Sequence, residues 1–254
     1  MNQVVTVSVE NKLAIVRIDR DHGNAINDEV VDGLMTACQE LESDPAVRGM
    51  LLASRGKLFS PGLDLQELSE LDRPTMTRFL HRFNACVLVL YTFSKPMVAA
   101  LHGHAVAGGC VLSLTADWRI LKEGAMVGLN EVRIGVPFPF GVSMILRESV
   151  PRRHLEEIAL FGRNYRGREA KEAGLVHEVR PEQGFEAYCL ERLQELSDRD
   201  PRAFAITKRY LRSSTTERIR ASDPHFVGDF LDSWFSPETR EKVVAVLAGL
   251  EKKG

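Results

Sequence analysis

Residues 102–136 read HGHAVAGGCVLSLTADWRILKEGAMVGLNEVRIGV, and the chain is organised around them. Gly108 and Gly109 stand at the start of a predicted helix, directly after an apolar strand-like segment. Without Cβ atoms the backbone can approach a ligand closely, and the first N–H groups of a helix have no intrahelical acceptor. Glu131 is the one carboxylate of the apolar, amide-rich run that follows. The stretch predicts an N–H group near Gly108 that stabilises a negative oxygen and a carboxylate that moves a proton.

A second turn of the same kind occurs earlier, in the segment FSPGLD at residues 59–64. Gly62 can adopt unusual dihedral angles and leave the N–H of Leu63 free, while a helix begins at Leu65. Each turn also has a simpler interpretation: tight helix–sheet packing for the glycine pair, and a turn capped by Asp64 here. Glu131 by itself could be a solvated loop residue. Two such turns in one sheet favour a site with two N–H donors.

The composition is that of an ordinary globular protein and excludes several classes of function. The 254 residues are 44% hydrophobic and 27% charged, with a formal net charge of -2, so a nucleic-acid partner is not expected. The four cysteines have no metal-ligand spacing and are predicted to be buried free thiols of a reducing compartment. No secretory signal or membrane-spanning run is recognisable. We expect a soluble, cytoplasmic protein without a membrane partner.

Strand-like and helical patterns alternate through the first part of the chain. A hairpin is predicted at residues 4–9 and 13–18, followed by a loop at 20–28 and a helix capped by Asp28 that ends near 43–45. Buried strands are predicted at 49–54, 96–101 and 118–121, and helices at 65–71, 75–93 and 108–114. This alternation predicts parallel crossovers and an α/β layered architecture.

After Phe140 the pattern becomes almost wholly helical, with one last strand predicted at residues 176–179. Two units follow from this change: a core at 1–199 and a helical region at 200–254, which must pack on the core or on a neighbouring subunit. Helices are predicted at 142–148, 153–161, 166–173, 185–197, 201–212, 225–234 and 237–250.

Five segments together resemble the crotonase (enoyl-CoA hydratase/isomerase) superfamily. They read GNAIN, FSPGLDLQEL, HGHAVAGGCVLSLTADWRIL, VGLNEVRIGV and GREAKEAGLVHEV, and the similarity spans about residues 4–179. FSPGLDL and GLNEVRIGV look most like the Δ3,Δ2-enoyl-CoA isomerases. The resemblance implies a crotonase-like spiral of ββα units and a helical C-terminal trimerisation region, hence a homotrimer or a dimer of trimers.

The resemblance also implies the residues of an acyl-CoA site. Leu63 and Gly108 would supply the two N–H groups of a thioester oxyanion hole, and Glu131 the acid/base group. The backbone at Ala25 and Pro61 would hold the adenine end of coenzyme A, although proline has no N–H to donate. The implied substrate-binding set is completed by Ser60, Leu65 and Gly109. No metal or separate cofactor is implied, because coenzyme A is part of the substrate.

One departure from the family pattern bears on the reaction. Family hydratases carry a second glutamate just after the Gly-Gly-Cys turn, where this chain has Val111. Hydration needs a base and an acid, whereas moving a double bond needs one group that removes a proton and returns it. The sequence therefore favours an enoyl-CoA isomerase. The alternatives are a hydratase or another enolate-forming enzyme that uses a different acid, and a catalytically silent CoA-binding or RNA-binding relative.

Several other side chains have two possible roles. Two acids near the site, Asp64 and Glu148, are more simply a cap and a surface residue. His102 and His104 have no third metal ligand nearby and are predicted to be satisfied loop residues. Four phenylalanines could line an acyl-tail pocket or be plain core: Phe79, Phe83, Phe138 and Phe140.

Overall fold

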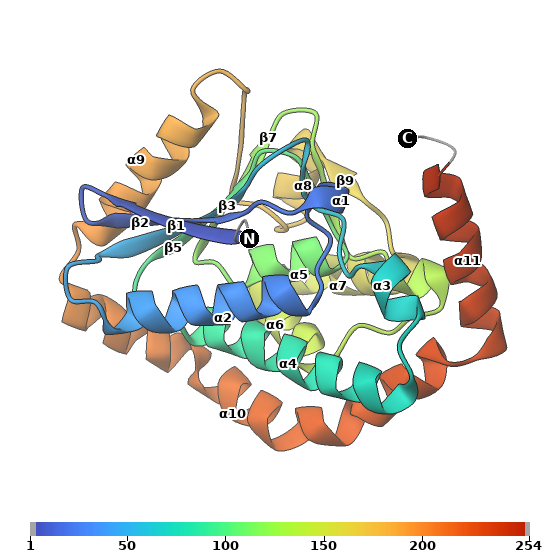
Figure 1. Cartoon of the computed structure of the whole chain (residues 1–254). Coiled ribbons are helices and arrows are strands. Elements are labelled where there is room, and N and C mark those ends of the chain that lie inside the picture. The colour runs from blue at the N-terminus through green and yellow to red at the C-terminus, as the bar shows by residue number, and fades with distance from the viewer. Residues whose placement is uncertain (1–3, 252–254) are drawn as a thin grey trace.

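The computed structural model describes residues 4–251 and contains two sheets whose strands alternate along the chain (Figure 1). The larger sheet has the order β1-β2-β3-β5-β7-β10, with β1 antiparallel to β2 and every other neighbouring pair parallel. Its strands are β1 (Val5–Glu10), β2 (Leu13–Ile18), β3 (Gly49–Ser54), β5 (Met97–Leu101), β7 (Trp118–Lys122) and β10 (Glu178–Arg180).

The smaller sheet has the order β4-β6-β8-β9 and consists of very short strands. These are β4 (Leu58–Ser60), β6 (His104–Val106), β8 (Met126–Gly128) and β9 (Tyr165–Arg166). The pairs β3/β4, β5/β6 and β7/β8 each place one strand in either sheet and then lead into α3 (Leu65–Ser69), α5 (Gly108–Leu114) and the 3-10 helix η1 (Glu131–Ile134). This repetition confirms the predicted spiral of ββα units.

Helices cover both faces of the larger sheet. Strand β3, GMLLAS, is buried along its whole length, as expected of a strand packed on both sides. On one face lies α9 (Phe185–Ser197), which places Phe185, Cys189 and Leu193 against the sheet. The other face is covered by α2 (Asp28–Ser43), with α4 (Arg73–Thr92) packed on α2. All four cysteines are buried and free, as predicted.

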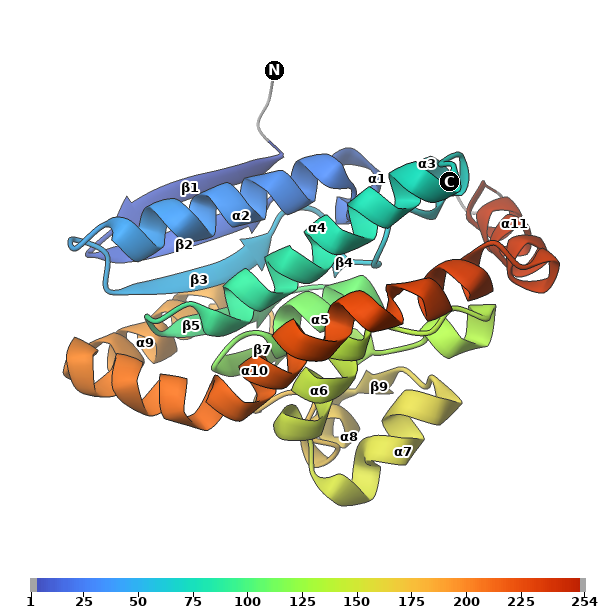
Figure 2. The ribbon, with the colours of Figure 1, turned by 90° about the horizontal axis from the view of Figure 1, so that it is seen from below.

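The C-terminal part is helical, as predicted, but its longest element differs from the prediction. Residues 201–212 and 225–234 belong to a single helix, α10 (Pro201–Trp234), which runs beside α4 and α6 (Phe140–Ser149) (Figure 2). Asp223 lies in the segment predicted to interrupt it, and its carboxylate accepts from the Gly141 N–H at 2.9 Å and from Asn84 Nδ2 at 2.6 Å. These tertiary contacts hold the helix across a segment of poor local propensity.

The remaining elements agree with the prediction within a few residues. They are α1 (Asp21–Asn24), a short turn within the predicted loop, and α7 (Arg152–Phe161), α8 (Gly167–Glu172) and α11 (Pro237–Glu251). The predicted cap of α2 was wrong, because Asn27 accepts from the Val30 N–H, whereas Asp28 pairs with Arg82. The last strand lies at β10 instead of 176–179. Within residues 4–251, no helix is long and apolar enough to cross a bilayer.

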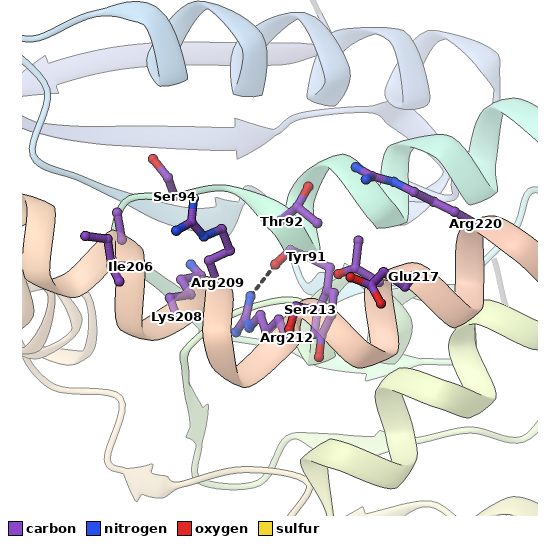
Figure 3. A pocket seen from close by; sticks show the side chains of 12 residues that line it. Tyr91, Thr92, Ser94, Ile206, Lys208, Arg209, Arg212, Ser213, Glu217 and Arg220 are labelled. Atoms are coloured by element: carbon purple, nitrogen blue, oxygen red, sulfur yellow. Dashed lines mark hydrogen bonds between the residues drawn. The ribbon is translucent and has the colours of Figure 1, made fainter.

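Asp117 joins α10 to the larger sheet through a cluster of buried charges. Its carboxylate accepts from Lys208 Nζ at 2.7 Å, from Arg212 at 2.8 Å and from the Met97 N–H at 2.8 Å. Arg212 also donates to the carbonyl of Tyr91, as Figure 3 shows, beside a hollow of about 420 Å³ between α10 and the end of α4. Burial lowers the pKa of Lys208 to about 8, and Asp117 opposes that shift.

We predict that Asp117→Ala lowers the free energy of unfolding by roughly 3 kcal/mol, because it leaves two buried cations without their counter-ion. Urea denaturation followed by circular dichroism measures the change. Asp232→Ala is the matched control: its pair with Arg73 is exposed, so the loss should stay under about 1 kcal/mol. Equal losses in the two variants would contradict the assignment.

Candidate active site

A pocket of about 1010 Å³ lies where the turns that follow β4 and β6 meet the C-terminal helices. Its walls are mostly apolar, and residues from both the spiral and the region after residue 200 contribute to them. The residues that line it are His22, Ala25, Pro61, Leu63, Asp64, Leu65, Gln66, Phe83, Val106, Ala107, Gly108, Val111, Asn130, Glu131, Arg133, Ile134, Val136, Pro137, Phe138, Pro139, Phe230, Trp234, Val246 and Leu247.

The turn from β6 into α5 has an unusual backbone. Ala107 is the N-cap of α5 and has φ 48° and ψ -126°, a region that side chains avoid and that costs on the order of 1–3 kcal/mol. Its N–H is held by the Gly128 carbonyl at 2.8 Å, and its own carbonyl accepts from the Val111 N–H at 3.0 Å. These bonds fix the peptide that leads into Gly108, whose N–H stands at the start of the helix.

The turn from β4 into α3 is fixed by a parallel bridge to the segment that follows α1. The Ile26 N–H donates to the Gly62 carbonyl at 2.8 Å, and the Asp64 N–H donates to the Ile26 carbonyl at 2.9 Å. Gly62 has φ 106°, a conformation that favours glycine. Leu63 stands between these two bonds, so its peptide is held in place without using its own N–H.

The two turns pack backbone against backbone. A methyl group on Gly62 would lie 2.8 Å from Ala107 Cβ and 3.0 Å from the Gly108 nitrogen, and one on Gly108 would lie 3.4 Å from the Leu63 nitrogen. Leu63 and Gly108 both line the pocket. Within the described part of the chain, neither of their N–H groups donates to a protein acceptor. The predicted pair of donors is therefore brought together at one wall of the pocket.

Glu131 is the first residue of η1 and places a carboxylate in the same pocket. Its Oε2 is buried and has no hydrogen-bond partner among the described residues, although the residue as a whole is only partly buried. Burial raises the pKa of Glu131 to about 7. Val111, the residue at the position of the second family glutamate, also lines the pocket and is 2% exposed. The pocket thus holds a carboxyl group poised near neutral pH beside an apolar wall.

The other polar side chains near the site already have partners. Asp64 caps α3 by accepting from the Glu67 N–H at 3.1 Å and pairs with Arg20 at 2.7 Å, and Glu148 does not line the pocket. His102 bonds the Gly56 carbonyl at 2.9 Å, and His104 accepts from the Met126 N–H at 3.1 Å, as expected of satisfied loop residues. No group of three potential metal ligands occurs within residues 4–251.

Comparison with known proteins agrees with this geometry. Residues 8–252 match the enoyl-CoA hydratase/isomerase family. The chain belongs to that family. A putative enoyl-CoA hydratase from Thermus thermophilus is 34% identical over 203 residues, which cover 76% of this chain and 77% of that protein. Human mitochondrial enoyl-CoA delta isomerase 1 is 28% identical over 233 residues, which cover 91% of this chain and 77% of the human protein.

The fold agrees over nearly the whole length of a family structure. The crystal structure of human mitochondrial Δ3,Δ2-enoyl-CoA isomerase matches with a TM-score of 0.94 at 26% identity and covers 99% of both chains. The crotonase fold is thus confirmed, and the chain is a crotonase-family acyl-CoA enzyme. Its relatives include hydratases and isomerases, so the choice between these reactions depends on the side chains of the site.

The residues that the family resemblance implied lie in two positions relative to the pocket. Ala25, Pro61 and Leu65 line it, whereas Ser60 and Gly109 lie behind the wall. A methyl group on Gly109 would lie 2.2 Å from the Ser60 carbonyl oxygen, so this glycine is needed for the close packing of the two turns. The Ser60 hydroxyl accepts from the Gly62 N–H at 3.2 Å and steadies the same turn.

The acyl side of the pocket was only partly foreseen. Of the four candidate phenylalanines, Phe83 and Phe138 line the pocket, and Phe79 and Phe140 do not. Sequence reasoning missed the contributions of α10 and α11, namely Phe230, Trp234, Val246 and Leu247. The dense aromatic run before residue 235 was the one signal for them, since it required a packing partner but did not identify one.

The raised pKa of Glu131 predicts a stability that depends on pH. Because the folded-state pKa of about 7 exceeds the ordinary 4.5, the stability associated with this group is fully present below about pH 4.5 and is lost as pH rises through about 7. The loss approaches about 3 kcal/mol for a shift of this size. Glu131→Gln cannot ionise, so its unfolding free energy relative to the parent should rise by that amount between about pH 5 and pH 9.

Urea denaturation across this pH range measures the difference. Glu148→Gln is the matched control, since that side chain is exposed and lies outside the pocket, and its difference from the parent should stay constant. A pH-independent difference for Glu131→Gln would show that the carboxyl group is not perturbed.

Proposed function

We propose that this protein is an enoyl-CoA isomerase that moves a double bond from C3 to C2 of an acyl-CoA thioester. The observation that carries the proposal is the presence of one available acid/base group in the pocket. Two carboxylates line it, Glu131 and Asp64, and Asp64 is occupied by Arg20 and by the start of α3. Glu131 has a buried oxygen without a protein partner.

In the proposed reaction, ionised Glu131 removes a proton from C2 of a 3-enoyl-CoA. The electrons of the broken C–H bond delocalise through the thioester, and the resulting dienolate oxygen accepts from the N–H groups of Leu63 and Gly108. Glu131 then returns the proton to C4, which leaves the double bond between C2 and C3. A pKa of about 7 suits both steps, because the same group must accept and release the proton near neutral pH.

The second candidate is hydration of a 2-enoyl-CoA, and the curated relatives with that activity keep it open. Hydration needs one group to activate water and one to protonate the α-carbon. Val111 presents only hydrocarbon to the pocket, so a hydratase would have to recruit another acid. The apolar wall favours the isomerase, whose dienolate must be kept from water.

For the rest of the substrate, we propose that the backbone at Ala25 and Pro61 holds the adenine end of coenzyme A. Both residues line the pocket, and the Ala25 carbonyl also accepts from Arg20 at 3.1 Å. The reaction as written needs no metal or redox cofactor. By the family resemblance we further propose a homotrimer or a dimer of trimers.

We expect Glu131→Gln to lower kcat for 3-enoyl-CoA isomerisation by a factor on the order of 10² to 10⁴, because Gln cannot accept the proton. Glu148→Gln should keep the parental rate. The assay follows formation of the conjugated thioester by ultraviolet absorbance. In parallel, rapid hydration of a 2-enoyl-CoA by the parent would favour the second candidate, and undiminished isomerisation by Glu131→Gln would exclude the assigned base.

Gly62→Ala tests the pair of N–H donors. The added methyl group must push Ala107 and the Gly108 nitrogen away from Leu63, and loss of one oxyanion-hole donor typically lowers kcat by about 10²- to 10³-fold. Gly56→Ala is the control, because Gly56 also has a positive φ of 81° but nothing within 4 Å of the added methyl group. It should cost stability, about 1–2 kcal/mol, without lowering kcat. Equal rates in both variants would contradict the assigned donors.

A further inference from the structure

Among the described residues, six buried side-chain polar atoms have no hydrogen-bond partner, and two of them belong to residues that line the active-site pocket. One is Glu131 Oε2, which the proposed reaction uses. The other is the indole Nε1 of Trp234, a residue that is 1% exposed. The remaining four atoms, on Asn164, Tyr165, Arg180 and Ser197, belong to residues that do not line this pocket.

An unpaired indole N–H at this position is costly. The group can only donate, and leaving a buried donor unsatisfied costs about 1–3 kcal/mol. The other tryptophan of the chain shows the usual arrangement, since Trp118 Nε1 donates to Glu178 at 2.8 Å. A donor kept without a protein partner at the wall of a binding pocket indicates an acceptor on the ligand.

The surroundings of Trp234 restrict what that acceptor can be. Phe230 stacks on the indole with ring centroids 6.1 Å apart, and Leu247 of α11 lines the same pocket. A bridging water needs two to four polar partners, which such apolar neighbours do not supply. Arg240 lies over the indole ring at 5.5 Å, but it donates to the Ser69 carbonyl and does not line the pocket. An incoming carboxylate would therefore be buried without a cation.

We infer that the acyl chain of the natural substrate carries a neutral oxygen acceptor, such as a keto or ether oxygen, in its distal part, and that Trp234 Nε1 donates to it. This inference rests on the proposed function, because it assumes that an acyl-CoA thioester fills the pocket. It assigns Trp234 as a specificity-determining residue that recognises substrate beyond the reacting carbons. The substrate class is then an oxygenated 3-enoyl-CoA instead of a plain hydrocarbon chain.

The test measures binding, so that it does not depend on turnover. Saturated acyl-CoA thioesters of equal length, either plain, with a keto group at successive distal positions, or with a terminal carboxylate, are titrated calorimetrically into the parent and Trp234→Phe. For the best-placed keto thioester, Trp234→Phe should weaken binding about 10-fold, the size of one hydrogen bond to a buried acceptor. The plain thioester should bind both proteins equally, and Trp118→Phe should leave the discrimination unchanged.

A second readout needs no variant of Trp234. The chain has two tryptophans, so its nitrogen-15 spectrum contains two indole N–H signals, and Trp118→Phe identifies one of them. The Trp234 signal should shift downfield on addition of the keto thioester and much less with the plain one. The inference is overturned if Trp234→Phe weakens all thioesters by the same factor, if the carboxylate thioester shows the same Trp234 dependence, or if the indole signal responds equally to every chain. If no thioester binds, the proposed function fails as well, and the two failures are thereby distinguished.

Discussion

The backbone-to-backbone contact between the turns after β4 and β6 is the constraint on which the site depends. Gly109 lies so close to the Ser60 carbonyl that no side chain could stand between them, and Gly62 meets Ala107 and Gly108 in the same way. Because the strands before these turns are neighbours in the smaller sheet, their register brings the Leu63 and Gly108 N–H groups to one wall. The oxyanion site is therefore a property of the spiral, and no polar side chain is needed to build it.

This arrangement has energetic costs that fall at the reacting centre. Ala107 is held at a strained φ, two N–H groups have no protein acceptor, and burial raises the pKa of the Glu131 carboxyl group. Each feature destabilises the folded chain by on the order of 1–3 kcal/mol, and each would be compensated when a thioester oxygen and a transferable proton are present. The larger sheet, buried on both faces, and the Asp117 cluster supply the stability that such a site requires.

The sequence predicted the parts of this structure that depend on local patterns. The buried strand GMLLAS and the glycine turns could be recognised because their signals lie within a few adjacent residues, and the family motifs then identified Glu131, Leu63 and Gly108. The short strands of the smaller sheet escaped detection, since two or three residues cannot show a period. Helix α10 was broken wrongly because Asp223 gains its partners, Gly141 and Asn84, only through tertiary packing. The same limit applies to Trp234, whose unpaired N–H is visible only once its surroundings are known.

Chemistry and substrate selection are therefore encoded in different parts of the chain. The proton-transfer group and the two N–H donors come from turns of the spiral, where any substitution meets backbone atoms. The acyl wall comes in part from α10 and α11, whose side chains can change size without moving the donors. A boundary near residue 200 separates these two roles along the sequence, yet the pocket is complete only when both parts surround it. A change of substrate would thus be reached most readily through residues such as Phe230, Trp234 and Leu247, while the reaction itself stays fixed by Glu131 and the glycine turns.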